Sequence, residues 1–382
     1  MLFTFLLLLS GFAEERVLVR TLAAQKALVV DSQQLSINTT THLQRPFRVY
    51  FDDRWRILAS NKQYSLKLQE PLVLRFAKAR VQGREYEGEL RLVYNKKRQG
   101  IDVIYPVPMA KYLKGVLPAE MPAAWPLEAL KAQVVASKSY VISQRKEKKD
   151  LPFDVDADVM DQVFNKSRYF KLPKSLRDKV DQAIEATKEI YLQSGTDVLK
   201  AYFHSHCGGH TENPVKVWHA KEKWQGSADP YCMQVHVPRW QYNVNLEDFS
   251  QKLAEQFGEK KGEVLRIMDG ERNDSGRLEK VFVFLKDGRI RAWPTQDIRQ
   301  SLGFSKVKST KMQISLENGK IHFQGKGYGH GVGMCQHGAK KMAAMGKSYR
   351  EILNFYYPKA SLKKIEAEAK YLAEKTKETA PL

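Results

Sequence analysis

Glu120 is a candidate acid–base catalyst because of the residues around it. It lies in LPAEMPAAWP, residues 117–126, where Pro118, Pro122 and Pro126 fall four residues apart. This spacing predicts that no helix runs through residues 118–125, so Glu120 is expected on a stiff turn ahead of a helix. A carboxyl group among apolar side chains is desolvated, which raises its pKa and keeps it protonated for use as a general acid. An exposed glutamate that caps the helix is the alternative, and on this stretch alone it is the stronger one.

A second segment rich in reactive side chains is YFHSHCGGHTE, residues 202–212. Its candidate zinc ligands are His204, His206, Cys207 and His210, with Cys232 or His236 to complete a set. Zinc normally takes four ligands, and four from so tight a stretch cannot all converge. The other interpretations are a polar turn that presents His204 and Ser205 to a ligand, and a solvated turn whose glycines adopt positive φ. We therefore predict no metal here.

The glycine-rich run GKGYGHGVGMCQHGA, residues 325–339, has a glycine at every second position from Gly325 to Gly333. A dinucleotide fingerprint would need a βαβ context and an acidic residue downstream, and this run has neither. Alternate glycines let an extended backbone approach a ligand or another segment closely. We interpret the run as a ligand-facing loop, with a close-packed strand as the alternative.

The aspartate-rich segment FDVDADVMDQVF, residues 153–164, is a weak candidate for a cation loop. It lacks the glycine and the distal glutamate of an EF-hand. We interpret it as a solvated polar loop.

The elements that must position these residues are short strands and one long helix. Residues 46–104 alternate between apolar and polar side chains in runs such as FRVYF, WRILA and LVLRF, which predicts strands joined by turns. After Pro126, Leu127, Leu130, Val134 and Val141 recur at helical spacing and predict a buried stripe. Because strands and helices do not alternate regularly, we predict an α+β fold: a mixed β-rich domain with a long central helix after the Glu120 turn.

Composition narrows the class of partner. The chain has 382 residues and a formal net charge of +20, with Lys and Arg spread along its length. Such a surface favours polyanions: nucleic acid, anionic lipid or acidic wall polymers. The sequence contains no zinc-finger, helix-turn-helix or RNA-binding signature, so we expect no nucleic-acid partner. Three cysteines permit at most one disulfide.

The sequence predicts four regions. Residues 1–13, MLFTFLLLLSGFA, read as a secretory signal peptide, too short to span a bilayer. Residues 14–99 form a β-rich N-terminal region, residues 100–358 the main domain, and residues 359–382 a charged tail, expected as an exposed helix that frays. We expect an exported protein, periplasmic or extracellular, with no stable membrane span.

Several segments together resemble the SpoIID/LytB family (sporulation stage II protein D and the amidase enhancer). They are KYLKGVLPAEMPAAWPLEALKAQVVASKSY with its EMP core, QVF at Gln162, YFHSHCGGHTE, and GKGYGHGVGMCQHGAKKMAAMGKSYREILNFYYP; SGRLEKV matches a weaker motif. The resemblance spans residues 100–358 and implies a secreted protein that acts on peptidoglycan. SpoIID-type members are lytic transglycosylases that cut glycan strands stripped of stem peptides, whereas LytB-type members modify an amidase.

Carried over by position, Glu120 matches the family's catalytic glutamate. The substrate-binding candidates on motif positions are Lys131, Gln133, Lys138, Tyr140, Gln162, His204, Ser205, His330, Gln336 and Gly338. A lytic transglycosylase needs one acid/base carboxyl, whereas a hydrolase ordinarily needs a second carboxylate. The other acids in the main motifs, Glu128, Glu212 and Glu351, have no obvious claim to that role.

One departure from the family concerns metal. Some members bind zinc through Cys and His before the Gln-x-aromatic element, but here that segment reads DVDADVMDQ. We therefore expect no zinc there and no other cofactor. The expected partners are peptidoglycan glycan strands and an amidase or other cell-wall enzyme. Two rivals are a non-catalytic wall-binding protein that enhances an amidase, and a polyanion-binding module that is indifferent to Glu120.

Overall fold

The computed structural model describes residues 15–32, 35–37, 46–59, 62–66, 71–158, 161–218 and 224–364. The chain divides into two compact units. The first comprises residues 1–120, 141–173 and 365–382, and the second comprises residues 121–140 and 174–364. The predicted signal peptide lies outside the described residues, as does the tail beyond Lys364.

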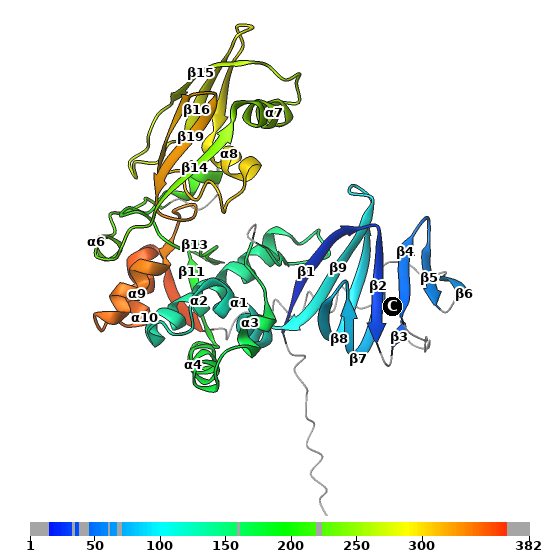
Figure 1. Cartoon of the computed structure of the whole chain (residues 1–382). Coiled ribbons are helices and arrows are strands. Elements are labelled where there is room, and N and C mark those ends of the chain that lie inside the picture. Colours follow the sequence, from blue (N-terminus) through cyan, green and yellow to red (C-terminus); the bar gives the residue numbers. More distant parts are fainter. Residues whose placement is uncertain are drawn as a thin grey trace, which may run out of the picture. The chain divides into compact units, whose positions relative to one another are not determined.

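The first unit is built on one large sheet (Figure 1). Its strands are β1 (Arg16–Gln25), β2 (Ala27–Ser32), β3 (Ser36–Ile37), β4 (Phe47–Phe51), β5 (Trp55–Ala59), β6 (Lys62–Leu66), β7 (Leu72–Val81), β8 (Arg84–Asn95), β9 (Gly100–Pro108) and β10 (Val155–Asp156). They lie in the order β10-β1-β9-β8-β7-β2-β4-β5-β6, with β3 beside β7. All neighbours pair antiparallel except β1 and β10, which pair parallel.

The predicted strands between residues 46 and 104 are confirmed, and the alternation explains them. In β4 and β5 every second side chain is buried, because one face of each strand packs on the core. Strand β9 differs: its residues 100–107 are all buried. The predicted domain boundary at Gly100 lies between β8 and β9, which pair at Asn95 and Gly100.

Helix α1 (Met109–Glu120) follows β9 directly and places Glu120 at its last position. The prediction that residues 118–125 are not helical is therefore wrong for Pro118–Glu120. Proline lacks an N–H and its ring crowds the carbonyl four residues earlier, but its fixed φ is compatible with a helix. Pro118 therefore removes a single intrahelical hydrogen bond in the last turn, and the helix ends soon after it. Helix α3 (Lys166–Phe170) packs on α1.

Helix α2 (Leu127–Glu147) begins just after Pro126, as predicted, and the boundary between the units falls within it. The carbonyl of Pro126 accepts the N–H groups of Ala129 and Leu130 at 3.0 and 3.2 Å. Residues 132–142 are all buried, polar side chains such as Gln133 and Lys138 included, so α2 is a central core helix with no solvent-exposed face over this length.

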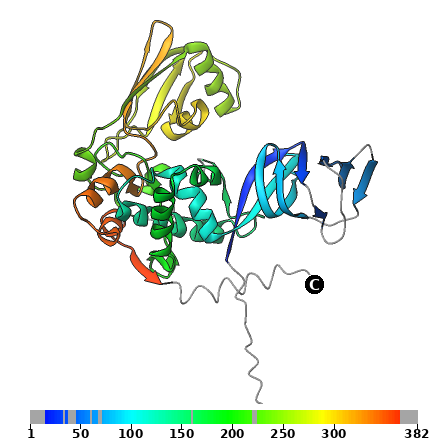
Figure 2. The same ribbon diagram turned by 60° about the horizontal axis from the view of Figure 1, so that its bottom comes forward.

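Around α2 the second unit forms a mixed core. The surrounding elements are α4 (Lys174–Glu185), β11 (Ile190–Ser194), β12 (Asp197–Val198), β13 (Phe203–His204), α5 (Pro214–Trp218), α6 (Pro230–Met233), β20 (Met334–Cys335), α9 (Gln336–Ala344), α10 (Tyr349–Tyr356) and β21 (Ser361–Lys364). Ala132, Val135 and Ala136 of α2 share one apolar core with residues of α9 and α10, which lie beside it in both views (Figures 1 and 2). Residues 361–364 pair with β11 as a strand, so the helix predicted there is wrong.

A second apolar core in this unit is formed by two three-stranded sheets and the helices that pack on them. Its elements are β14 (Arg239–Asn245), α7 (Leu246–Phe257), β15 (Val264–Asp269), β16 (Lys280–Leu285), β17 (Ile290–Pro294), α8 (Thr295–Leu302), β18 (Met312–Glu317) and β19 (Lys320–Lys326). The sheets run β14-β19-β18 and β15-β16-β17, and Phe249, Trp293 and Phe323 fill the space beside them. The predicted α+β class is confirmed. In the ranges that the structure describes, no helix combines the length and apolar character needed to cross a bilayer.

Candidate functional site

The carboxyl group of Glu120 is held at the C-terminal end of α1. The backbone N–H of Val163 donates a hydrogen bond of 2.7 Å to its Oε1. Burial raises the pKa of Glu120 to about 7, although the Val163 N–H and the positive charge of Arg168 both oppose that rise. The residue as a whole keeps some exposed surface. The pKa of Glu120 is thus raised, as the sequence predicts. The residue lies at the end of a helix, however, and not on the predicted turn.

The segment that holds Glu120 is fixed against α1. Tyr112 donates its hydroxyl to Gln162 Oε1 at 3.1 Å, and its ring stacks on Phe164 with centroids 5.6 Å apart. Asn165 N–H donates to the carbonyl of Gly115 at 3.0 Å. Gly115 has to be glycine, because a Cβ there would lie 2.5 Å from the Phe164 ring. Gln162 is fully buried and holds this segment in register with α1.

Asp154, Asp156 and Asp161 of the segment before Gln162 are ion-paired and not freely solvated, which corrects the sequence interpretation for these three; Asp158 is exposed, as expected. Arg20 forms ion pairs with Asp156 at 2.6 Å and with Asp102 at 3.2 Å. Arg145 binds Asp154 at 3.2 Å, and Lys148 binds Asp161. These carboxylates are bound to cationic side chains, so the segment does not fit the zinc site that some family members carry there.

The candidates on α2 lie in the second unit and are mostly buried. Lys131 is partly exposed and pairs with Glu128 at 2.6 Å. Gln133 donates to Ser137 Oγ at 3.0 Å and accepts from Gln336 Nε2 at 3.2 Å. Those contacts join α2 to the first residue of α9.

Lys138 and Tyr140 lie further along the same helix. Lys138 is 1 % exposed, and its Nζ donates to the carbonyls of Thr187 and Lys188. A substrate could reach this amine only after those hydrogen bonds break. Tyr140 packs edge-on against Tyr202, with ring centroids 5.9 Å apart.

The glycine run forms a loop whose backbone packs against other parts of the second unit. Gly327, Gly329, Gly331 and Gly333 all have positive φ, between 69° and 109°. A Cβ on Gly329 would lie 2.7 Å from His204 Cβ, so this position requires glycine for close packing. The structure therefore favours close packing of the run over a ligand-facing loop. The backbone is not extended, although the alternate glycines predicted an extended segment.

His204 and His330 come together beside this loop, with ring centroids 5.6 Å apart. His204 Nδ1 lies 3.0 Å from the carbonyl of Val332, so Nδ1 carries the proton and Nε2 is unprotonated. Burial and the nearby charge of Arg277 lower the pKa of His204 to about 3. Burial and the neighbouring cationic groups also lower the pKa of His330, whose Nδ1 accepts the N–H of Val332 at 3.1 Å. Both imidazoles are therefore neutral near neutral pH.

Ser205 and Gly338 complete the candidate set. The carbonyl of Ser205 accepts the backbone N–H of His337 at 3.1 Å and lies 2.9 Å from His337 Nδ1. Gly338 lies on α9, where a Cβ would collide with the Tyr356 hydroxyl and lie 2.6 Å from Asp229 Oδ2. Packing alone thus requires glycine at position 338.

The remaining acids of the motifs already have partners. Glu128 pairs with Lys131 and accepts the N–H of Tyr349 at 2.8 Å. Glu212 is buried and accepts Ser275 Oγ at 2.6 Å. Glu351 forms a capping box with Ser348 at the start of α10. Each of the three carboxylates therefore has a structural role.

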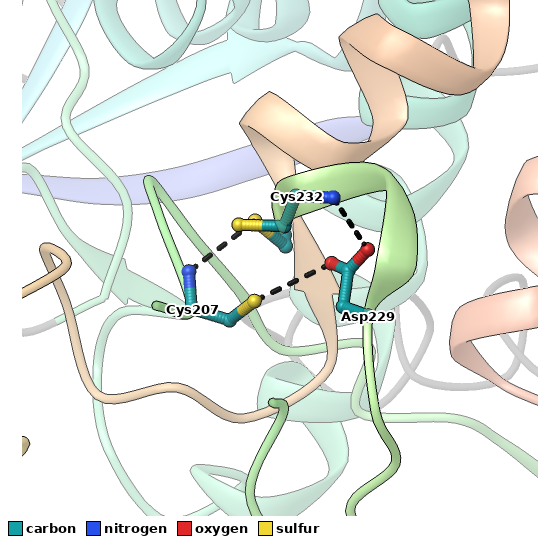
Figure 3. Close-up of side chains that lie close together, drawn as sticks. Cys207, Asp229 and Cys232 are labelled. Atoms are coloured by element: carbon teal, nitrogen blue, oxygen red, sulfur yellow. Dashed lines mark hydrogen bonds between the residues drawn. The ribbon is translucent and has the colours of Figure 1, made fainter. Parts of the chain in front are cut away.

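Sequence reasoning missed one cluster. Cys207, Asp229, Cys232 and Cys335 are all buried, and their ligand atoms lie within 4.8 Å of one another (Figure 3). None of the cysteines is in a disulfide. The candidate zinc ligands named from the sequence include Cys207 and Cys232 but not Asp229 or Cys335. The available signal was that Cys207 lies in the histidine-rich segment and Cys335 in the glycine-rich run.

Comparison with known proteins now gives the family. Residues 97–193 match the family model described as stage II sporulation protein (SpoIID), and residues 178–333 match a domain of unknown function. An uncharacterized protein of Brachyspira hyodysenteriae is 34 % identical over 278 residues, 72 % of this chain and 71 % of the relative. Stage II sporulation protein D of Bacillus subtilis is 27 % identical over 295 residues, 74 % of this chain and 82 % of the relative. The amidase enhancer of Bacillus subtilis is 29 % identical over 294 residues, 65 % of this chain but 40 % of the relative.

The fold and the buried glutamate define an α+β protein with a candidate acid–base centre. The chain belongs to the SpoIID/LytB family.

Proposed function

We propose that the protein is a peptidoglycan lytic transglycosylase with Glu120 as its general acid and base. The observation that carries this proposal is the carboxyl of Glu120, with a pKa raised to about 7 by burial and one oxygen hydrogen-bonded to Val163. Both protonation states of such a group are accessible near neutral pH, as an acid that later acts as a base requires.

In the proposed reaction, protonated Glu120 gives its proton to the glycosidic oxygen that leaves the muramoyl C1. The resulting carboxylate then takes the proton from the C6 hydroxyl of the same sugar as that oxygen attacks C1. The C1–O bond to the leaving sugar breaks, a C1–O6 bond forms, and the product ends in a 1,6-anhydromuramoyl group. Glu120 regains its proton, so the cycle closes without water.

The pairing of the neighbouring carboxylates supports this reaction over hydrolysis. Besides Glu120, the carboxylates whose charges act on Tyr112 are Asp161 and Asp154. Both are ion-paired, with Lys148 and Arg145. A hydrolase ordinarily needs a second carboxylate to activate water or attack the sugar. A carboxylate committed to a buried ion pair is poorly suited to that role.

The other candidates divide by exposure. Within the second unit, the partly exposed candidates are Lys131, Ser205 and His330, and we propose that they form a glycan-binding surface of that unit. His204 joins them because its buried Nε2 has no hydrogen-bond partner among the described residues. We propose that the buried candidates hold the surrounding segments in place; they are Gln133, Lys138, Tyr140, Gln162, Gln336 and Gly338.

The test compares the wild-type protein with Glu120→Gln on native peptidoglycan and on peptidoglycan stripped of stem peptides. Mass spectrometry should find 1,6-anhydro ends from the wild type, preferably on stripped strands, and none from the variant. The matched control is Glu185→Gln, which alters an exposed glutamate that pairs with Lys188 and should keep wild-type activity. Anhydro ends released by Glu120→Gln would refute the assignment, and reducing ends would indicate a hydrolase.

A second candidate function rests on one relative. Because the chain resembles a protein named amidase enhancer, it is also a candidate for a wall-binding protein that stimulates a cell-wall amidase. In that case neither the wild-type protein nor Glu120→Gln would release glycan fragments. Both would raise the rate of an added amidase equally. Under either function we propose that the protein is exported and acts in the periplasm or at the cell wall.

A further inference from the structure

We infer that Cys207, Cys232, Cys335 and Asp229 form a closed structural zinc site in the second unit. The inference does not depend on whether Glu120 is catalytic. It rests on four independent features of the cluster: its spacing, its hydrogen bonds to sulfur, its carboxylate and its charge.

The spacing of the ligand atoms fits a tetrahedral ion. With Zn–S bonds of about 2.3 Å and Zn–O bonds of about 2.0 Å, a tetrahedron has S···S edges of about 3.8 Å and S···O edges of about 3.5 Å. Cys335 Sγ lies 3.5 Å from Cys232 Sγ, and Cys207 Sγ lies 3.4 Å from Asp229 Oδ2 (Figure 3 shows the latter pair). All four ligand atoms fall within 4.8 Å of one another. Small adjustments would close the shell.

Backbone amides surround the sulfur atoms as they do around thiolates. Cys207 N–H points at Cys335 Sγ at 3.3 Å, and Gly209 N–H points at Cys207 Sγ at 3.3 Å. Gly338 N–H donates to Cys335 Sγ at 3.5 Å, because Cys335 is the N-cap of α9. Amide donors and a helix N-terminus stabilise a negatively charged sulfur, which is the form that binds metal.

The carboxylate is oriented by neighbours of its own. Asp229 is fully buried, and its Oδ1 accepts the N–H of Cys232 at 2.8 Å. Its Oδ2 accepts the hydroxyl of Tyr356 at 2.8 Å and faces Cys207. Such outer hydrogen bonds fix a metal-binding carboxylate in one orientation. The need for glycine at 338 follows, because any side chain there would displace Tyr356 and Asp229.

A buried arginine lies beside the cluster. Arg277 is 1 % exposed, and its Nη2 donates to the carbonyl of Cys207 at 2.8 Å. Its Nε and Nη1 have no hydrogen-bond partner among the described residues. A buried guanidinium so poorly paired is costly unless anionic charge lies nearby. The buried Glu212 supplies part of that charge, and the three cysteines also act on Arg277. Three thiolates and one carboxylate around Zn²⁺ leave a net charge of about −2, which Arg277 would partly offset.

Zinc suits this ligand set best because it accepts thiolate and carboxylate together in a four-coordinate shell. Four protein ligands leave no open position, so the ion would have a structural role. It would join the ends of β13 and β20, the start of α9 and helix α6, and thereby fix the segments that carry His204, Ser205 and Gln336.

The first experiment uses the full chain purified under reducing conditions without chelator. We expect elemental analysis to find about one zinc per chain, and Co²⁺ exchange to give the strong sulfur-to-metal charge-transfer bands of a thiolate site. Removing the metal should lower Tm, and Zn²⁺ should restore it. Thiols are then counted in denaturant. Metal-free protein with three free thiols, or with one thiol and a Cys232–Cys335 disulfide, would overturn the inference.

Variants test the individual ligands, each scored by zinc content and Co²⁺ spectrum. Cys335→Ser and Asp229→Asn should lower the affinity for zinc at least about tenfold, as removing a ligand does. The control Asp287→Asn, in an exposed turn where Asp287 pairs with Arg289, should bind zinc as the wild type does. His206 lies 3.3 Å from Cys232 Sγ and is the competing fourth ligand. Full zinc binding by Asp229→Asn together with its loss in His206→Gln would overturn the assignment of Asp229.

Discussion

The backbone N–H of Val163 donates to Glu120 Oε1 at 2.7 Å, and this contact defines the candidate catalytic group. Burial alone would favour the protonated acid, whereas the amide and Arg168 favour the carboxylate. Their balance leaves the pKa at about 7. A group so balanced can give up a proton and take it back within one catalytic cycle.

The pH dependence of strand cleavage follows from this pKa. Because the first step needs protonated Glu120, kcat/KM should fall about tenfold per pH unit once the pH exceeds about 7. Measuring kcat/KM for cleavage of stripped glycan strands between pH 5 and 9 tests this decrease. A rate that stayed level to pH 9 would exclude Glu120 as the general acid.

The same shift affects stability. The pKa of Glu120 is raised in the folded state, so between about 4.5 and 7 the folded protein holds a proton that the unfolded chain has lost. Stability from this group is therefore lost as the pH rises through that window, by about 1.4 kcal/mol per unit at most. Glu120→Gln lacks the titration. We expect its Tm relative to the wild type to rise between pH 4.5 and 7 and then stay level, as measured by calorimetry.

Gly115→Ala should damage the site without touching Glu120. The new methyl group would lie 2.5 Å from the Phe164 ring, and Phe164 follows the residue whose amide binds Glu120. We expect strand cleavage to fall up to about 100-fold and stability to fall by about 1–3 kcal/mol.

A second substitution provides the control for Gly115→Ala. Phe164→Leu should partly restore cleavage in the Gly115→Ala background, because the smaller side chain makes room for the methyl group. An unchanged rate in Gly115→Ala alone would show that the Val163 contact does not depend on this packing.

Local patterns predicted the elements well. The alternation of FRVYF and WRILA matches β4 and β5, and the helix predicted to follow Pro126 is α2. Both patterns arise within a few residues, where one face of the element meets the core. The end of α1 was predicted wrongly because the proline spacing reports only the hydrogen bond lost within the helix. It does not report the contacts with other segments that hold the last turn. These include the hydrogen bonds of Asn165 to Gly115 and of Arg168 to Ala119.

Contacts between distant residues could not be predicted in the same way. Asp156 was expected to be solvated, but its partner Arg20 lies 136 residues away. Cys207 and Cys335 are separated by 128 residues and meet because β13 and β20 pair in parallel. A single sequence does not reveal such pairings, and so it identified Glu120 but not the cysteine cluster.

The buried ion pair between Arg145 and Asp154 gives a prediction about the first unit. Both side chains are 8 % exposed, and Asp154 Oδ2 also accepts the N–H of Leu18 at 2.9 Å. Asp154→Asn would leave the buried Arg145 guanidinium with Glu15, at 2.9 Å, as its remaining carboxylate partner. Because one of two counter-charges is lost, we expect urea-induced unfolding to show a loss of about 1–3 kcal/mol, less than for a buried charge left with no partner.

The matched control for Asp154→Asn is Asp178→Asn. Asp178 pairs with Lys174 at the protein surface, where both side chains are largely exposed. Water and salt screen an exposed pair, so this variant should change stability by less than about 1 kcal/mol. Equal effects of the two substitutions would mean that Glu15 alone is a sufficient counter-charge for Arg145, and that the segment leading to Gln162 does not depend on the ion pair with Asp154.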